Sequence, residues 1–143
     1  MEIRCMQEAD RKEVLSMMKV FYNSAAVFTN GSYDIFVADI DACLSNSPFL
    51  AGYVFEENDE VLGYAMVAKS FSTEFGKPCV WLEDLYLKEF ARGRGIIPSF
   101  FKFIETENPN AVFRLEVEKE NEHAVHVYRK AGFTELPYLE MKR

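Results

Sequence analysis

Hydrophobic and polar residues are arranged along the chain in patterns that predict short strands and helices. The segment 2–6 has the pattern of a strand. The segment 11–24 repeats apolar residues at helical spacing after Asp10, a residue type suited to cap a helix. A second helical pattern runs from Tyr33 and stops before Pro48. Two helices are therefore expected ahead of the main strands.

Three strand patterns follow these helices. Two runs rich in aromatic and aliphatic residues lie within 49–71, on either side of the polar turn 57–60. The segment 78–87 has the composition of the third strand of the same meander. The middle of the chain therefore predicts three antiparallel strands.

The C-terminal part predicts two more helices and two more strands. Pro98 is expected to begin the first of these helices, and Gly132 suits the end of the second. The expected elements are a helix over 98–107, a strand over 111–120, a helix over 121–133 and a strand over 134–143. Together the patterns predict a mixed α/β domain with a central, mostly antiparallel sheet of about six strands and four flanking helices.

The composition is that of one globular domain, which we expect to span residues 1–143. A hydrophobic fraction of 49% is enough for a substantial core. The formal net charge of −7 argues against nucleic acid and against an anionic membrane as partners, because both need an extended positive field. It suits a cationic partner such as an amine, although acidic surfaces also serve solubility.

Cysteine and histidine give no sign of a metal site. The three cysteines have no C-x-x-C spacing, so neither a zinc site nor a disulfide framework is implied, and a reducing cytoplasm is the expected compartment. The N-terminus is charged from its second residue, and no apolar run approaches the ~18 residues needed to span a bilayer, so no export or membrane segment is expected. His123 and His126 stand three residues apart on one helix, but no further ligand supports a metal there.

The segment ARGRGI, residues 91–96, concentrates positive charge and glycine between a strand and a helix. Gly93 and Gly95 allow consecutive backbone N–H groups to turn toward one anion, and Arg92 and Arg94 add charged donors. This arrangement indicates a polyphosphate site, although such a loop is also compatible with an ordinary solvated turn.

Two familiar nucleotide motifs do not fit this segment. A Walker loop needs Gly-Lys followed by Ser or Thr, whereas Ile96 and Ile97 follow Gly95 here. The dinucleotide fingerprint needs a third glycine where this chain has Pro98. Neither of these two nucleotide-binding folds is therefore indicated.

Three motifs in this order resemble the GNAT superfamily of N-acetyltransferases. WLEDLYL is similar to the family's central strand, and ARGRGI is similar to its pyrophosphate loop. NEHAVHVYRKAGF is similar to the helix that carries Asn, a small residue, Tyr and a terminal Lys-x-Gly-Phe. The resemblance covers residues 78–133 and implies that acetyl-coenzyme A (acetyl-CoA) is the co-substrate and that no metal takes part.

The resemblance also implies which residues hold acetyl-CoA. The backbone at the splayed end of the central strand would hold the pantetheine arm and the thioester carbonyl. Asn121 would contact the cofactor, cap its helix, or do both. Ile97 stands where the family has Gly or Ala, and Pro98 lacks an N–H. We therefore expect slightly altered contacts between this loop and the cofactor. The cofactor-binding set is Leu85, Tyr86, Leu87, Arg92, Gly93, Arg94, Gly95, Ile96, Ile97 and Asn121.

Acetyl transfer to an amine needs a base for the amine and an acid for the departing thiolate. Tyr128 occupies the family's thiol-side tyrosine position and is the expected acid; the alternative is a tyrosine that only packs against the sheet. Glu83 and Asp84 are adjacent carboxylates in an apolar strand and point to opposite faces. Glu83 shares a face with Leu85 and is the expected base, through water, and Asp84 is assigned to substrate binding or structure.

The acceptor is expected to be a small cationic amine, because LEDLY is similar to the strand of the polyamine acetyltransferases. Tyr33 and Phe36 are expected to line its groove, as are Phe71 and Phe75, although aromatic residues at such spacing also form cores. A protein or peptide amine, and a non-catalytic sensor of coenzyme A, are the alternatives. The family often forms dimers, so a homodimer is compatible with the resemblance.

Overall fold

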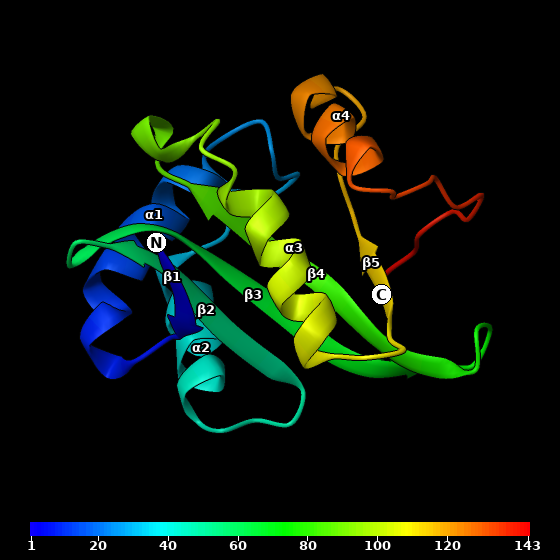
Figure 1. The fold of residues 1–143 in the computed structure, drawn as a ribbon, viewed down its shortest axis with the longest axis horizontal. Helices are drawn as coiled ribbons and strands as arrows, with labels where there is room; N and C mark the ends of the chain where they lie inside the picture. Colours follow the sequence, from blue (N-terminus) through cyan, green and yellow to red (C-terminus); the bar gives the residue numbers. More distant parts are fainter.

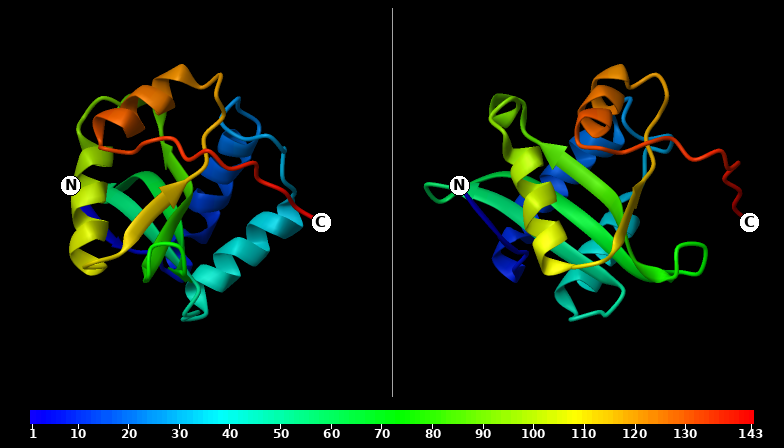
Figure 2. Two further views of the ribbon diagram at one scale, coloured as in Figure 1. Left: turned by 90° about the vertical axis from the view of Figure 1, so that its right-hand side faces the viewer. Right: turned by 45° about the vertical axis from the view of Figure 1, so that its right-hand side comes forward.

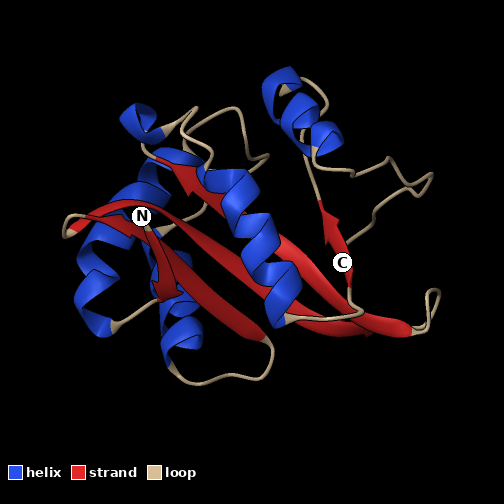
Figure 3. Cartoon of the chain, viewed as in Figure 1, coloured by secondary structure: helices blue, strands red, loops and turns tan.

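A five-stranded sheet crosses the centre of the molecule in the computed structural model, which describes residues 1–143 (Figure 1). The strands lie side by side in chain order. The first four are antiparallel to their neighbours, and the last pair is parallel. Figure 3 distinguishes these strands from the helices and loops. The strands are β1 (Glu2–Cys5), β2 (Leu50–Glu57), β3 (Glu60–Ser72), β4 (Lys77–Leu87) and β5 (Val112–Leu115).

Four α-helices cover the two faces of this sheet. α3 lies over one face, and α1 and α2 lie over the other, as the left view of Figure 2 shows. α4 stands beyond the end of β5 and packs with α3 through aromatic side chains. None of these helices has the length and apolarity that a bilayer-spanning helix requires. The helices are α1 (Arg11–Tyr22), α2 (Tyr33–Leu44), α3 (Ile96–Glu107) and α4 (Glu122–Lys130).

Each face of the sheet has its own hydrophobic core. On the α3 face, Phe55 packs edge-on against Phe100 with ring centroids 5.3 Å apart. On the opposite face, Met18 of α1 and Ile40 of α2 are completely buried against Tyr64 of β3. A sheet covered on both sides needs strands that are apolar at every position. This explains why residues 62–67 of β3 are all buried.

The structure confirms the mixed α/β fold with a mostly antiparallel sheet and four helices, but the sheet has five strands. The expected sixth strand, residues 134–143, is exposed throughout and forms no ladder. Pro137 has no N–H to donate to a neighbouring strand, which weakens any pairing of this segment. The segment instead passes outside β5, toward the side of the sheet that carries α2 (Figure 2, left).

α3 begins two residues earlier than the sequence predicted. Gly95 precedes the helix with a φ of 76°, so the chain enters the helix at Ile96. Pro98 is then the third helical residue. Its missing N–H is tolerated there, because N–H groups in the first turn have no helical partner.

Asp10 precedes α1, but its carboxylate does not cap that helix. It accepts a hydrogen bond from the backbone N–H of Gln7 at 2.8 Å and is paired with Arg4, also at 2.8 Å. The Arg4 guanidinium holds the pKa of Asp10 below its usual range. Arg4 also pairs with Glu56 of β2. The predicted cap therefore ties β1 and β2 to the turn before α1.

Candidate active site

The predicted acid and base and part of the predicted cofactor-binding set lie around a gap between β4 and β5. These strands are paired only where Cys79–Leu82 lie beside Val112–Leu115. β4 continues beyond this region to Leu87, whereas β5 ends at Leu115. The last residues of β4 therefore have a free edge on the side of β5.

Backbone groups of Leu85 and Leu87 point toward this free edge. The N–H of Lys88 donates to the carbonyl of Leu62 in β3 at 2.9 Å. Along an antiparallel pair of strands, residues alternate between those bonded to the partner strand and those that are not. Leu87 and Leu85 lie one and three residues before Lys88, so their N–H and C=O groups face away from β3. In agreement, the Leu87 carbonyl accepts a hydrogen bond from Arg92 Nε at 3.3 Å.

Glu83 is the extra residue of a β-bulge. Leu82 and Asp84 lie opposite consecutive residues of β3, so Glu83 has no residue opposite it. A bulge interrupts the alternation of side chains between the two faces. Leu82 and Leu85 accordingly both pack on the α3 face, although they are three residues apart. Glu83 is exposed at the start of the gap.

Five consecutive backbone N–H groups are free between β4 and the first turn of α3. The N–H groups of residues 93–97 donate to no protein acceptor, and the first helical bond joins the Ser99 N–H to the Gly95 carbonyl at 3.2 Å. Gly93 has a φ of 71°, and like Gly95 it adopts a left-handed conformation that favours glycine. A Cβ at either glycine would meet no atom within 4 Å. Such a loop, with the positive end of a helix dipole, is suited to phosphate.

The side chains of this loop differ in their surroundings. Ile96 is buried in the core and Ile97 packs against it, so these residues present only their backbone N–H groups to a ligand. Arg92 lies along the end of β4 through its bond to the Leu87 carbonyl. Arg94 is paired with Glu57 at the end of β2. A partly exposed pair of this kind is weak, which leaves Arg94 free to exchange its partner for a phosphate.

Tyr128 of α4 packs between two phenylalanines and presents a free hydroxyl. Its ring lies 6.3 Å from that of Phe101 and 6.0 Å from that of Phe133, measured between centroids. Burial raises the pKa of the hydroxyl, which therefore carries its proton at neutral pH. No protein group forms a hydrogen bond with it. Tyr128 thus has the packing role that the sequence left open, and it can also donate a proton.

Both ends of α4 are fixed by local hydrogen bonds. The side chain of Asn121 accepts a bond from the Ala124 N–H at 3.2 Å, as a capping residue does. Gly132 has a φ of 96°, and the N–H of Phe133 reaches back to the Tyr128 carbonyl at 3.0 Å. The helix that carries Tyr128 therefore has a defined start and end.

A cleft of about 1800 Å³ opens at the gap between β4 and β5. It extends from α4 to the connection between α1 and α2, residues 26–29, and to the C-terminal segment. The glycine loop, Tyr86 and Leu87 lie outside its lining. Of the predicted site residues, it is lined by Phe75, Glu83, Asp84, Leu85, Asn121 and Tyr128.

Carboxylates in this cleft raise one another's pKa. Partial desolvation by the walls of the cleft raises the pKa of Glu83, and the negative charges of Asp39 and Glu140 raise it further. A hydrogen bond with Glu140, together with burial, raises the pKa of Glu116 to about 7. Glu83 is therefore a better proton acceptor than an ordinary glutamate. The cleft as a whole favours a cationic ligand.

Asp84, the neighbour of Glu83, is a buried carboxylate fixed by two tyrosines. Tyr22 of α1 donates to one of its oxygens at 2.8 Å, and Tyr64 of β3 donates to the other at 2.9 Å. Burial raises its pKa to about 6 although both hydrogen bonds act in the opposite direction. Only 4% of Asp84 is exposed, which corresponds to the structural role that the sequence left open.

Three predicted substrate-lining residues lie elsewhere. Phe36 is buried in the core between α2 and the sheet, where it packs against Tyr22 with ring centroids 5.1 Å apart. Tyr33 is 60% exposed at the start of α2, and Phe71 is exposed near the end of β3; neither lines the cleft. Phe75 does line it. The helical spacing of Phe36 thus reflects core packing.

The sequence profile of the acetyltransferase (GNAT) family matches residues 16–133, which include β4, the glycine loop and α4. The chain belongs to this family. The match confirms the resemblance on which the expected N-acetyltransferase activity rests. A search of curated protein sequences found no match.

Solved structures of other proteins share the fold of this GNAT chain over nearly its whole length. A possible acetyltransferase from Clostridium difficile 630 has a TM-score of 0.82 and 22% identity, with 99% of this chain and 95% of that chain covered. The aminoglycoside N-acetyltransferase AAC(6')-Iy in complex with CoA has a TM-score of 0.75 and 18% identity, covering 99% and 98%. At these identities the likeness establishes the fold alone.

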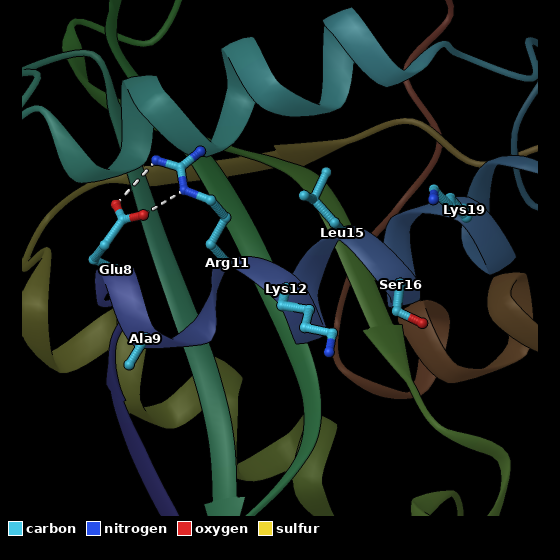
Figure 4. A pocket seen from close by; sticks show the side chains of 7 residues that line it. All are labelled: Glu8, Ala9, Arg11, Lys12, Leu15, Ser16 and Lys19. Carbon is cyan, nitrogen blue, oxygen red and sulfur yellow. Dashed lines mark hydrogen bonds and ion pairs between the residues drawn. The ribbon is translucent and has the colours of Figure 1, made fainter.

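A second hollow of the GNAT chain lies on the surface of α1 and contains no comparable chemistry. Figure 4 shows Arg11 paired there with Glu8, and Arg11 is also paired with Asp41. Lys12 and Lys19 point from the same helix. No residue of β4, the glycine loop or α4 lines it.

Sequence reasoning missed two features of the site in this GNAT chain. One is the bulge at Glu83, which becomes visible only when β4 is paired with β3. The other is Arg114 of β5, whose guanidinium lies over the ring of Trp81 in β4 at 4.6 Å from its centroid. These residues are 33 positions apart, and only the parallel register of β4 and β5 makes them neighbours.

Proposed function

We propose that this GNAT-family chain, as one N-acetyltransferase domain over residues 1–143, transfers the acetyl group of acetyl-CoA to a primary amine of a small cationic molecule. The amine attacks the thioester directly. Family membership supports the reaction and its donor. AAC(6')-Iy, a protein of the same fold, is described in complex with CoA and with a bisubstrate analog, CoA-S-monomethyl-acetylneamine.

The observation that carries this proposal is the meeting of a proton acceptor, a proton donor and free backbone groups at the gap beside β4. Glu83, Leu85 and Tyr128 line one cleft and come from two elements. The free N–H groups of residues 93–97 belong to the loop that follows β4. The backbone donors for a polyphosphate thus lie just after β4, the strand that carries Glu83 and Leu85. Both of these residues are proposed to take part in acetyl transfer.

Acetyl-CoA supplies the acetyl group and, as a thioester, a thiolate leaving group. The N–H groups of residues 93–97, with Arg92 and Arg94, would hold its pyrophosphate. The Leu85 N–H would donate to the thioester carbonyl oxygen as negative charge develops there.

Glu83 and Tyr128 carry the two proton transfers. Glu83 accepts a proton from the ammonium group of the acceptor, through water, so that the nitrogen lone pair can form the new bond to carbon. As the carbon–sulfur bond breaks, the Tyr128 hydroxyl donates its proton to the sulfur, and the second proton that the nitrogen loses on becoming an amide returns to Tyr128 through water. The mutual influence of the cleft carboxylates keeps Glu83 a strong acceptor and attracts the cationic acceptor.

A panel of acceptors tests this proposal through the release of free thiol from acetyl-CoA. Diamines, polyamines and aminoglycosides are compared with peptides that present a lysine or a free N-terminus. Release with the small cationic amines and not with the peptides is expected. Release only with peptides would assign a macromolecular acceptor. Calorimetric binding of acetyl-CoA without release from any amine would assign a sensor instead.

A further inference from the structure

Arg114 is a positive charge in the acidic cleft that has no carboxylate partner. It lies in β5 directly beside Trp81 of β4, and its guanidinium carbon is 4.6 Å from the centre of the indole ring. It takes part in none of the ion pairs of the chain. Its Nε is buried and has no hydrogen-bond acceptor. The stack on Trp81, and not an ion pair, therefore fixes the position of this side chain.

An unpaired guanidinium is unusual where carboxylates are abundant. Arg114 is half-buried, and the partial burial of a guanidinium is unfavourable unless an anion compensates it. Glu116 and Glu140 line the same cleft, but neither forms an ion pair with Arg114. Glu74, near Tyr138, accepts a hydrogen bond from the Tyr138 hydroxyl at 2.9 Å. These carboxylates leave the Arg114 fork without a partner.

Arg114 and the acidic groups occupy different positions along the gap. Arg114 lies in β5, whereas Glu116 is the first residue after the strand ends at Leu115. Because β4 and β5 are parallel, the chain runs from Trp81 to Glu83 in the same direction as it runs from Arg114 to Glu116. The cleft thus has a positive position beside Trp81 and a negative region beside Glu83, which can face the two ends of one small molecule.

We propose that Arg114, held by Trp81, is a carboxylate-binding subsite, and that the acceptor is a basic amino acid whose side-chain amine reaches Glu83. This inference rests on the proposed function and names its acceptor class. A planar guanidinium binds a carboxylate through two parallel hydrogen bonds, which suits a ligand that enters with one end fixed. Such an acceptor keeps a net positive charge and agrees with the acidic cleft.

The matched ligands lysine, lysinamide and cadaverine test the subsite by calorimetry on the protein saturated with coenzyme A. Lysinamide replaces only the carboxylate by a neutral amide, and cadaverine removes it. Lysine is expected to bind at least about tenfold more tightly than either, because hydrogen bonds to charged groups are among the stronger ones. General attraction to the acidic cleft predicts the opposite order, since lysinamide and cadaverine carry more positive charge.

Two substitutions assign the preference to Arg114. Arg114→Gln is expected to abolish the advantage of lysine over lysinamide, and Arg114→Lys is expected to reduce it, because an ammonium group lacks the planar fork. Lys102→Gln, on the exposed surface of α3, removes the same charge outside the cleft and is the matched control. Thermal unfolding checks that each variant is folded.

The outcomes separate this inference from the proposed function. Wild-type protein that binds lysinamide or cadaverine as tightly as lysine overturns the subsite, even if it acetylates amines. A lysine preference that survives Arg114→Gln overturns the assignment to Arg114. Preferential binding of lysine without thiol release would leave the subsite standing and contradict the proposed transferase activity.

Discussion

Glu83 and Asp84 are adjacent in the sequence and have opposite environments. The bulge places Glu83 at the exposed start of the gap, whereas Asp84 points into the core beside Tyr22 and Tyr64. One carboxylate is therefore available to a substrate, and the other ties α1 and β3 to β4. The chemistry of this site depends on that one-residue irregularity.

Asp84 is expected to make stability depend on pH with a definite sign. Its pKa is about 6 in the folded protein, above the value of about 4 expected in an unfolded chain. The folded state therefore binds a proton more tightly, and the stability from this group is complete below pH ~4 and lost as pH rises through about 6. The loss is on the order of 3 kcal/mol.

Asp84→Asn removes this titration, and chemical denaturation at several pH values measures the effect. Between pH ~4 and ~7 the wild type is expected to lose unfolding free energy as Asp84 ionises, and the variant is not. The variant therefore becomes more stable relative to the wild type over this range. A constant difference over this range would show that Asp84 does not titrate there.

Candidate site residues were predictable from the sequence where the signal lies in their immediate neighbours along the chain. Glu83, Asp84 and the glycines of the loop stood out because charges and glycines interrupt apolar patterns. The partners of Asp84 were not predictable, since Tyr22 lies 62 positions away and meets it only through packing of α1 on the sheet. The Arg114 and Trp81 pair depends on strand register in the same way.

At the scale of elements, periodicity predicted most helices and strands, and local backbone geometry decided their ends. The helix after the glycine loop was expected to begin at Pro98, but the left-handed Gly95 sets its start at Ile96. The strand expected over residues 134–143 does not form. This segment contains Pro137, which has no N–H to donate, and it remains exposed. Positive φ values and missing N–H groups thus determine where regular structure begins and ends.

The glycine loop can be tested with two glycines that have the same backbone conformation. Gly95 has a φ of 76° and Gly76, in the turn between β3 and β4, has a φ of 62°. An added Cβ meets no atom within 4 Å at either position, so alanine brings a similar backbone strain of about 1–2 kcal/mol to both. Only Gly95 lies among the free N–H groups.

Gly95→Ala is therefore expected to weaken acetyl-CoA binding by about tenfold to a hundredfold, because a displaced loop loses hydrogen bonds to a charged phosphate. Gly76→Ala is expected to lower thermal stability to a similar extent and to leave acetyl-CoA binding unchanged. Calorimetry and thermal unfolding measure the two effects. Equal loss of affinity in both variants would mean that the loop holds no phosphate.

Across the whole molecule, acidic and basic residues are concentrated in different regions. The net charge is −7, and the acidic groups of the cleft raise one another's pKa without a basic partner. The basic residues Arg92 and Arg94 belong to the loop with free N–H groups. An acidic cleft and a basic loop meet at the end of β4, which agrees with the proposed cationic amine and polyphosphate donor.

The most direct test of the account is the rate of thiol release from acetyl-CoA, measured with and without a saturating small cationic amine for wild type and Tyr128→Phe. The wild type is expected to show amine-dependent release. The variant is expected to lose about a hundredfold in kcat, because a general acid contributes about that much. Its acetyl-CoA affinity should be unchanged, since the ring still packs against Phe101. Absence of amine-dependent release by the wild type, or full turnover by Tyr128→Phe, would contradict the account.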